Sequence, residues 1–313
     1  MSEYKINKSL QYPNVEFQDY YNKFETVEDM LAGLEWNDFF SHFYEISREE
    51  QEILIGESLQ ELNMFNEAKQ SEELSKCANS FKYWCHRYVE IYHYKHGQIP
   101  FINYKYQDRV IEGFENNKFN IVSKFRQAGL TTLSLLKSIH NCLFKNDQKI
   151  NIVSRTDRES IDASYITQQV MDNLPKWMYD PKQNNTSKYE KKFHTTNSRI
   201  YFNTPLSTIG QSSTCLIFNE AAFIEDMEKH WEAMYPIIAN GSSVQVFSSV
   251  NGINSWYNKI YKEAIKGNNQ FNPIAVDYWE HPTFSNPEWV ETVKSNYSKK
   301  IWKQEFMRNS CAY

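Results

Sequence analysis

The chain has 313 residues, of which 41% are hydrophobic, so it can bury a core large enough for one principal domain and a smaller appended one. No apolar run approaches the roughly 18 residues that a membrane-spanning helix needs, and the first ten residues contain no apolar signal region. We therefore expect a soluble, cytosolic protein. The five cysteines form no C-x-x-C pair, which argues against a zinc site and favours reduced, buried thiols.

The formal net charge of −5 is distributed unevenly along the chain. Residues 1–75 hold 5 Lys and Arg against 17 Asp and Glu, a net charge of −12, so residues 76–313 carry +7. A basic larger part could face a polyanion, and an acidic N-terminal part could face a protein partner. Charged runs are mostly solvated faces, so the asymmetry alone requires neither partner.

The N-terminal part is predicted to be helical. The pattern from Val27 to Gln70 has helical periodicity, and a further helix is predicted by apolar residues at alternating spacings of three and four. Those residues are Leu74, Cys77, Phe81, Trp84, Tyr88 and Ile91. We interpret this stripe as core packing. The sequence H-G-Q-I-P at 96–100 breaks the helix. We expect a helical subdomain over residues 1–98 and a main domain over residues 99–313.

The main domain alternates predicted strands and helices. The predicted strands are 119–123, 150–154, 199–203, 214–218, 244–248 and 273–277, and the predicted helices are 106–115, 131–144, 157–173, 228–239, 254–266, 286–296 and 298–308. Several of the strands are short, continuous apolar runs, which are typical of a sheet that is covered on both faces. The order predicts an α/β fold with helices on both sides of a sheet.

Residues 119–139 are predicted to form a strand, a loop and a helix, and this order indicates a phosphate-binding loop. The segment F-N-I-V-S-K-F-R-Q-A-G-L-T-T begins apolar, turns through glycine and leads into a helical pattern. In such a loop, backbone N–H groups and a helix N-terminus surround a polyphosphate. The usual pattern G-x-x-x-x-G-K-[ST] is not met, because Ser123 replaces its first glycine and Leu130 its lysine. The loop nevertheless offers Lys124 and Arg126 to phosphates and the Thr131 hydroxyl to magnesium. An ordinary turn with incidental charge is the alternative.

A second segment, T-C-L-I-F-N-E-A-A-F-I at 214–224, is a buried strand that ends in an acidic residue. A carboxylate in that place lies at the edge of the sheet where open α/β folds bind ligands. Glu220 is therefore predicted to polarise a water molecule for attack on a γ-phosphate. Asn219 stands where nucleotide hydrolases carry a magnesium-orienting aspartate, and its amide can still bond a metal-bound water. Taken alone, an acidic residue after a strand is more often a helix cap than a catalytic base, and the phosphate-type loop upstream is what favours the base.

In these motifs the chain resembles the ATPase part of the large terminase subunits of tailed bacteriophages, the motors that drive DNA into a procapsid. The similarity runs from about Ser71 to Arg308. It rests on Tyr104-Lys-Tyr106-Gln107, on K-x-R-Q-x-G-x-T-T at 124–132, on N-E-A-A-F at 219–223 and on S-S-V-N-G at 248–252. The resemblance implies a P-loop NTPase of the RecA-like type, with a mostly parallel sheet and an extra strand between the phosphate-loop strand and the acidic strand.

The resemblance also implies roles for individual residues. Glu220 and Arg126 would be catalytic, with Arg126 stabilising charge in cis, and Thr131 and Asn219 would hold Mg²⁺. Ser248, Ser249 and Asn251 would sense the γ-phosphate and couple it to movement. The residues implied in binding ATP are Tyr106, Gln107, Ser123, Lys124, Phe125, Arg126, Gln127, Ala128, Gly129, Leu130, Thr131 and Thr132. Of these, Tyr106 and Gln107 would read the adenine. From the residues alone, Gln107 could instead be an exposed helix-start residue, and 248–252 a plain strand-ending turn.

From the resemblance we expect an Mg²⁺-dependent ATPase that translocates double-stranded DNA without sequence preference. Its expected partners are the portal protein, the procapsid, the small terminase subunit and further copies of itself in a ring on the portal, in the host cytoplasm. The chain ends soon after W-x-x-E-F at 302–306, with no cluster of aspartates, so we expect no nuclease domain.

Two alternatives remain open. One is a helicase-like translocase, which would need a second RecA-like domain. The other is a nucleotide-binding scaffold with little turnover, suggested by Leu130, Asn219 and Ile209, the last of which stands where the family often has arginine.

Overall fold

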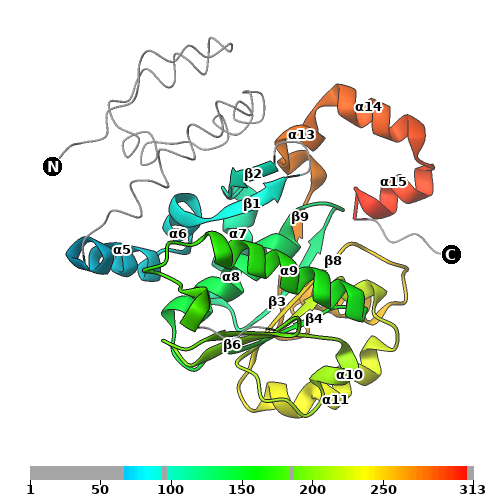
Figure 1. The fold of residues 1–313 in the computed structure, drawn as a ribbon. Coiled ribbons are helices and arrows are strands. Elements are labelled where there is room, and N and C mark those ends of the chain that lie inside the picture. Colours follow the sequence, from blue (N-terminus) through cyan, green and yellow to red (C-terminus); the bar gives the residue numbers. More distant parts are fainter. Residues whose placement is uncertain (1–66, 94–96, 184–186, 309–313) are drawn as a thin grey trace, which may run out of the picture. The chain divides into compact units, whose positions relative to one another are not determined.

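The computed structural model describes residues 67–93, 97–183 and 187–308 (Figure 1). The chain divides into two compact units, residues 1–104 and 105–313. The proposed domain limits of 1–98 and 99–313 stay a prediction. The predicted helical region from Val27 to Gln70 lies almost entirely outside the described residues. Within the described ranges, no helix is both long enough and apolar enough to span a membrane.

In the part of the first unit that the structure describes, two helices precede a pair of antiparallel strands. They are α5 (Glu67–Asn79) and α6 (Phe81–Tyr88), followed by the antiparallel strands β1 (Glu90–His93) and β2 (Gly97–Pro100). The prediction of one helix that reaches Ile91 was wrong. The Ser80 hydroxyl accepts a hydrogen bond from the Tyr83 N–H at 3.1 Å and starts a new helix, and Ile91 lies in β1.

The second unit contains a seven-stranded sheet in the order β5-β6-β4-β7-β8-β3-β9. Its strands are β3 (Phe119–Lys124), β4 (Lys149–Val153), β5 (Glu190–Phe193), β6 (Ser198–Asn203), β7 (Cys215–Asn219), β8 (Ser243–Ser248) and β9 (Asn272–Val276). All six predicted strands are confirmed. The sequence missed only β5, an edge strand that pairs antiparallel with β6, whereas every other pairing in this sheet is parallel.

Helices cover both faces of this sheet, with α8 and α9 across one face and α11 on the other (Figure 1). The helices are α7 (Lys105–Asn116), α8 (Leu130–Phe144), α9 (Asp157–Asn173), α10 (Pro205–Thr208), α11 (Met227–Ala239), α12 (Trp256–Ile265), α13 (Pro282–Ser285), α14 (Pro287–Asn296) and α15 (Lys299–Glu305). One buried cluster joins α11 and α12 to the sheet, and Leu216 and Phe218 of β7 lie within it. The predicted α/β fold is confirmed.

The order of the strands determines where the site residues meet. Strand β3 lies between β8 and β9, and β7 lies on the other side of β8, all of them parallel. Strand β8 is therefore the additional strand that was predicted between the phosphate-loop strand and the acidic strand. Because parallel strands end at the same edge, the residues that follow β3, β7 and β8 come together there.

From the packing of the core we expect two substitutions of aromatic residues by alanine to differ strongly in their effect on the free energy of unfolding. Phe218 is fully buried in β7, so Phe218→Ala should lower the free energy of unfolding by about 3–5 kcal/mol through lost burial and a cavity. Tyr235 on α11 is 53% exposed, and Tyr235→Ala should change it by no more than ~0.5 kcal/mol. Urea denaturation of both variants measures the difference, and equal losses would contradict the assignment of this core.

Candidate functional site

The loop between β3 and α8, residues 125–129, is shaped by two residues in the left-handed region. Gln127 has φ 68° and Gly129 has φ 69°, a conformation that glycine adopts without steric cost. The first backbone hydrogen bond of α8 runs from the Leu133 N–H to the Gly129 carbonyl at 3.0 Å. The N–H groups of residues 130–132 thus have no carbonyl of a preceding turn to bond. Such a helix start suits an anion.

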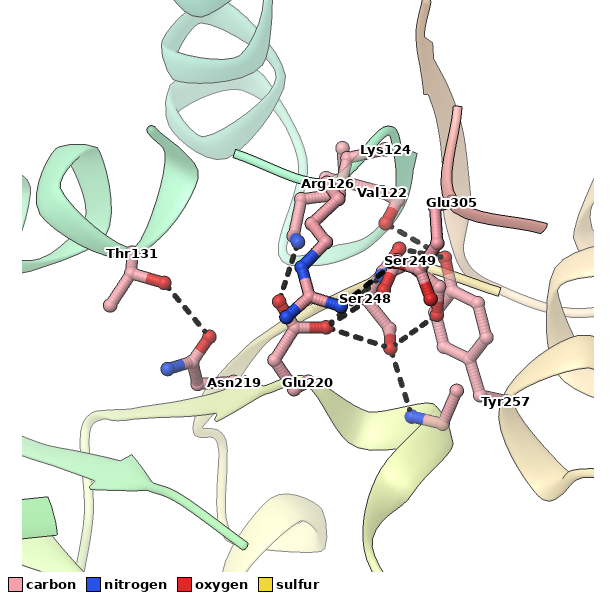
Figure 2. A network of polar contacts seen from close by, with 11 residues as sticks. Val122, Lys124, Arg126, Thr131, Asn219, Glu220, Ser248, Ser249, Tyr257 and Glu305 are labelled. Carbon is pink, nitrogen blue, oxygen red and sulfur yellow. Dashed lines mark hydrogen bonds and ion pairs between the residues drawn. The ribbon is translucent and has the colours of Figure 1, made fainter. Parts of the chain in front are cut away.

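The front of the loop is tied to other elements. The Phe125 N–H donates to the Val276 carbonyl at the end of β9 (3.2 Å), and the Arg126 N–H donates to the Glu305 carbonyl at the end of α15 (2.7 Å). The Arg126 guanidinium lies 3.5 Å from the Glu305 carboxylate and keeps 65% of its side chain exposed (Figure 2). The front of the loop is therefore fixed through its backbone, while its arginine side chain remains accessible.

Lys124 and Glu220, which are far apart in the sequence, form an ion pair. Lys124 is the last residue of β3 and only 4% exposed, and its Nζ lies 2.5 Å from Glu220 Oε1. The other carboxylate oxygen accepts from the Ser249 N–H at 3.1 Å and from the hydroxyls of Ser248 and Ser249 at 3.3 and 3.4 Å. Figure 2 shows these groups converging on Glu220. Glu220 itself is in the left-handed region (φ 53°) directly after β7.

The electrostatics of the pair keep Glu220 ionised. Burial opposes the charged form, but the Lys124 ammonium and the hydrogen bonds from Lys124, the Ser249 N–H and the Ser248 hydroxyl outweigh it, so the pKa of Glu220 is lowered. A carboxylate that stays charged at neutral pH can accept a proton or orient a water molecule. The Lys124 ammonium, which lies beside this carboxylate, can likewise bind an anionic ligand.

Thr131 and Asn219 bring two oxygen atoms together on the other side of the loop. The Thr131 hydroxyl, in the first turn of α8, donates to Asn219 Oδ1 at 3.1 Å (Figure 2). Magnesium is held in many nucleotide sites by few protein oxygens, with waters and phosphates completing the octahedron. The pair fits such an ion, although the Asn219 amide supplies no charge. Among the described residues, no group of three or more His, Cys, Asp or Glu could hold a metal.

The segment after β8 is joined to the segment after β7. The Ser248 hydroxyl accepts from the Ala222 N–H at 3.1 Å, and the Asn251 amide donates to the Ala222 carbonyl at 3.2 Å. The sequence did not identify Tyr257 of α12, whose hydroxyl donates to the Val122 carbonyl at 2.8 Å and to the Ser248 carbonyl at 3.4 Å. Tyr257 thus links the ends of β3 and β8, and no motif in the sequence marks it.

Tyr106 and Gln107 lie behind the loop. They are 0% and 1% exposed, and both donate to the Ala128 carbonyl, from the Tyr106 hydroxyl at 3.0 Å and from Gln107 Nε2 at 3.3 Å. The alternative of an exposed helix-start residue is therefore wrong for Gln107. That these two residues read adenine stays a prediction.

The remaining predicted residues divide by exposure. Ser123, Phe125 and Leu130 are buried, and Thr132 is half-buried. Leu130 thus fills the core where the usual motif has its lysine. In the sequence, Glu305 is distinguished only as the acidic residue of W-x-x-E-F at 302–306. Its backbone contact with the loop has no signature in the sequence, because any residue offers the same carbonyl.

The fold and the site together define a class. A mostly parallel sheet carries a phosphate-type loop after one strand and a carboxylate after another, with an additional strand between them, which is the RecA-like arrangement of P-loop NTPases. Residues 121–311 match the family described as terminase large subunit, T4likevirus-type, N-terminal. Because the match covers more than half of the chain, the chain belongs to this family.

Solved structures of large terminases share the fold. A mutant of the large terminase ATPase domain of Thermus phage P74-26 is 15% identical, with a TM-score of 0.53 over 67% of this chain and 95% of that one. The HK97 bacteriophage large terminase is 11% identical, with a TM-score of 0.61 over 74% of this chain and 55% of that one. The large terminase of a thermophilic bacteriophage in complex with ATP-gamma-S is 12% identical, with a TM-score of 0.51 over 66% of this chain and 52% of that one. The chain thus spans about half the length of the last two.

The lowered pKa of Glu220 predicts a pH-dependent stability. A carboxylate whose folded pKa is depressed stabilises the fold above its unfolded pKa of about 4.3, and this contribution is lost as the pH falls through the folded value. Glu220→Gln also leaves the buried Lys124 without its carboxylate. The variant should therefore be less stable than the parent at pH 7, and the difference should shrink in acid.

Urea denaturation at pH 7 and in acid, as far down as the fold survives, measures this difference. The matched control is Glu291→Gln, whose carboxylate is exposed and 3.8 Å from Lys294. We expect only a small, nearly constant effect from it. A stability gap for Glu220→Gln that does not vary with pH would contradict the pairing.

Proposed function

We propose that the chain is the ATP-hydrolysing subunit of a motor that moves double-stranded DNA into a viral procapsid. The observation that carries this proposal is the meeting of Lys124 and Glu220 at the end of the central strands, beside a helix N-terminus with open N–H groups. Family membership supports the same activity. An ordinary structural turn would have no need for a buried lysine, a carboxylate and two serines in one network.

In this proposal the triphosphate lies against the start of α8. The N–H groups of that turn, the Lys124 ammonium and the Arg126 guanidinium neutralise its charge. Both cations already have carboxylate partners, Lys124 in Glu220 and Arg126 in Glu305. When a phosphate enters, each cation exchanges its carboxylate partner for a phosphate oxygen. The exchange lowers the cost of desolvating the lysine, because it is never left unpaired. The complex of a large terminase of similar fold with ATP-gamma-S supports ATP as the nucleotide.

Glu220 is then released from Lys124 to orient the attacking water. Its other oxygen remains held by Ser249 and Ser248, which fixes the direction of the carboxylate. Thr131 and Asn219 would hold Mg²⁺, which would neutralise phosphate charge when bound. Ser248 and Asn251, both joined to the segment after Glu220, would pass a change at the carboxylate to the segment after β8.

Family membership supports a role in a phage DNA-packaging motor, which works with DNA and with a portal or capsid. We propose sequence-independent contact with double-stranded DNA, docking on the portal of the procapsid in the host cytoplasm, cooperation with the small terminase subunit, and a ring of several copies. The net charge of +7 on residues 76–313 is compatible with a polyanionic substrate.

The first test concerns turnover. Glu220→Gln keeps the shape of the side chain and removes its ability to accept a proton, so ATP hydrolysis should fall by about 10²- to 10⁴-fold while ATP binding is retained. Steady-state ATPase and equilibrium binding measure the two effects. Glu228→Gln, an exposed carboxylate on α11, is the matched control and should keep the parental rate. Hydrolysis by Glu220→Gln at the parental rate would show that Glu220 is only a cap. A parent that binds ATP without turnover would favour the scaffold.

The second test concerns DNA. Contacts to phosphates make affinity independent of sequence and release counterions, so binding should weaken steeply as salt rises. We would measure binding of random and phage-derived duplexes over a salt series, with an ATP analogue and portal present. DNA should also stimulate hydrolysis. A strong preference for one duplex, or affinity that salt leaves unchanged, would argue for a site-specific regulator instead of a motor.

A further inference from the structure

The hydroxyl of Tyr257 on α12 lies between two carbonyls at the ends of neighbouring strands. It donates to the Val122 carbonyl of β3 at 2.8 Å and to the Ser248 carbonyl of β8 at 3.4 Å (Figure 2). The tyrosine is 1% exposed, so water does not compete for these bonds. One buried side chain thus holds the main chain of both strands.

The Ser248 carbonyl belongs to the same peptide unit as the N–H that binds Glu220. In a planar, trans peptide unit the carbonyl and the N–H point in opposite directions. One end of this unit is the Ser248 carbonyl, which Tyr257 holds, and the other is the Ser249 N–H, which donates to Glu220 Oε2 at 3.1 Å. A rotation of the unit would move both groups together. The Tyr257 hydroxyl therefore limits the directions in which this N–H can point.

The two strand ends differ in what else supports them. Val122 lies within β3, which pairs with β8 on one side and with β9 on the other. Ser248 is the last residue of β8, and the pairing of β8 with β7 already ends one residue earlier. Beyond that point the Ser249 N–H is bonded to a carboxylate in place of a neighbouring strand. Loss of the Tyr257 hydroxyl should therefore loosen the peptide after β8 more than it loosens β3.

The peptide N–H is the donor that best fixes its carboxylate oxygen. Among the described residues, Glu220 Oε2 has three donors, and the Ser249 N–H at 3.1 Å is closer than the hydroxyls of Ser248 and Ser249 at 3.3 and 3.4 Å. Hydroxyls can rotate, and that of Ser248 also donates to the Ser249 carbonyl at 2.7 Å, so its one proton is shared. The direction of the N–H, by contrast, is set by the main chain.

We infer that Tyr257 is a positioning residue for the proposed hydrolysis, which fixes the Glu220 carboxylate through the peptide that joins Ser248 and Ser249. The inference rests on the proposed function and adds a residue whose hydroxyl is directed at the main chain. Lys124 holds one oxygen of the carboxylate, and the donors after β8 hold the other. Once a phosphate has taken Lys124, those donors determine where the carboxylate points.

The test is Tyr257→Phe, which keeps the ring and removes the hydroxyl. We expect kcat for ATP hydrolysis to fall about threefold to tenfold, the effect of one hydrogen bond, while Kd for ATP stays within about twofold of the parental value. Tyr261→Phe is the matched control, because the Tyr261 ring stacks on that of Tyr257 and its hydroxyl lies 3.5 Å from the Ile274 carbonyl of β9. The control should keep the parental kcat.

A second measurement separates positioning from a general loss of structure. Single-turnover hydrolysis, with the protein in excess over ATP, gives the residual rate of Glu220→Gln and of the double variant that also carries Tyr257→Phe. Without the ionised carboxylate there is no base to orient, so the second substitution should leave the residual rate unchanged. A purely structural role would instead lower the rate by the same factor with and without Glu220, and that result would overturn the inference.

The remaining outcomes are also decisive. A parental kcat in folded Tyr257→Phe, or a raised Kd for ATP with an unchanged kcat, would show that Tyr257 does not position the base. Thermal unfolding shows whether each variant is folded at the temperature of the assay. Tyr257→Met, which also lacks the hydroxyl and fills the space with a flexible apolar chain, replaces Tyr257→Phe if that variant is unfolded. A parent that binds ATP without turnover would instead refute the proposed ATPase.

Discussion

A lysine ammonium that is buried at the end of a central strand must have an anion beside it, because an unpaired buried charge costs several kcal/mol. Lys124 meets this constraint through Glu220, and the rest of the site is arranged around the pair. The pairing requires β3 and β7 to end at the same edge of the sheet, with β8 between them. It also requires the left-handed turn at Glu220, which directs the carboxylate back over β8. Without the parallel sheet, the Lys124 ammonium could not be buried beside its carboxylate.

Much of the second unit could be predicted from the sequence, because its strands are continuous apolar runs and its helices have clear periodicity. The edge strand β5 was missed because E-K-K-F is mostly charged and resembles a loop until it pairs with β6. The predicted helix through Ile91 failed for another reason. Spacings of three and four continue across Ser80, and they cannot show that its hydroxyl caps a new helix there.

The sequence could place the loop, Lys124 and Glu220 at one edge of the sheet, since the chain order and the parallel strands imply it. It could not show that the two charges touch, nor that Arg126 is held by Glu305. Contacts to backbone carbonyls, such as those made by Tyr257, leave no pattern of residue types. Gln107 illustrates the same limit: its identity was noticed from a motif, but its burial and its bond to Ala128 depend on how α7 packs.

Leu130 occupies the place where a phosphate loop usually has its cation, and here that place is buried. In the usual arrangement one residue must both begin the helix and carry the charge. In this chain the two tasks are separated. The charge sits on Lys124, in a strand that is hydrogen-bonded on both sides, and the helix start is held by an apolar side chain in the core. A loop built this way can change its shape around a ligand while the cation stays fixed to the sheet and the helix stays fixed to the core.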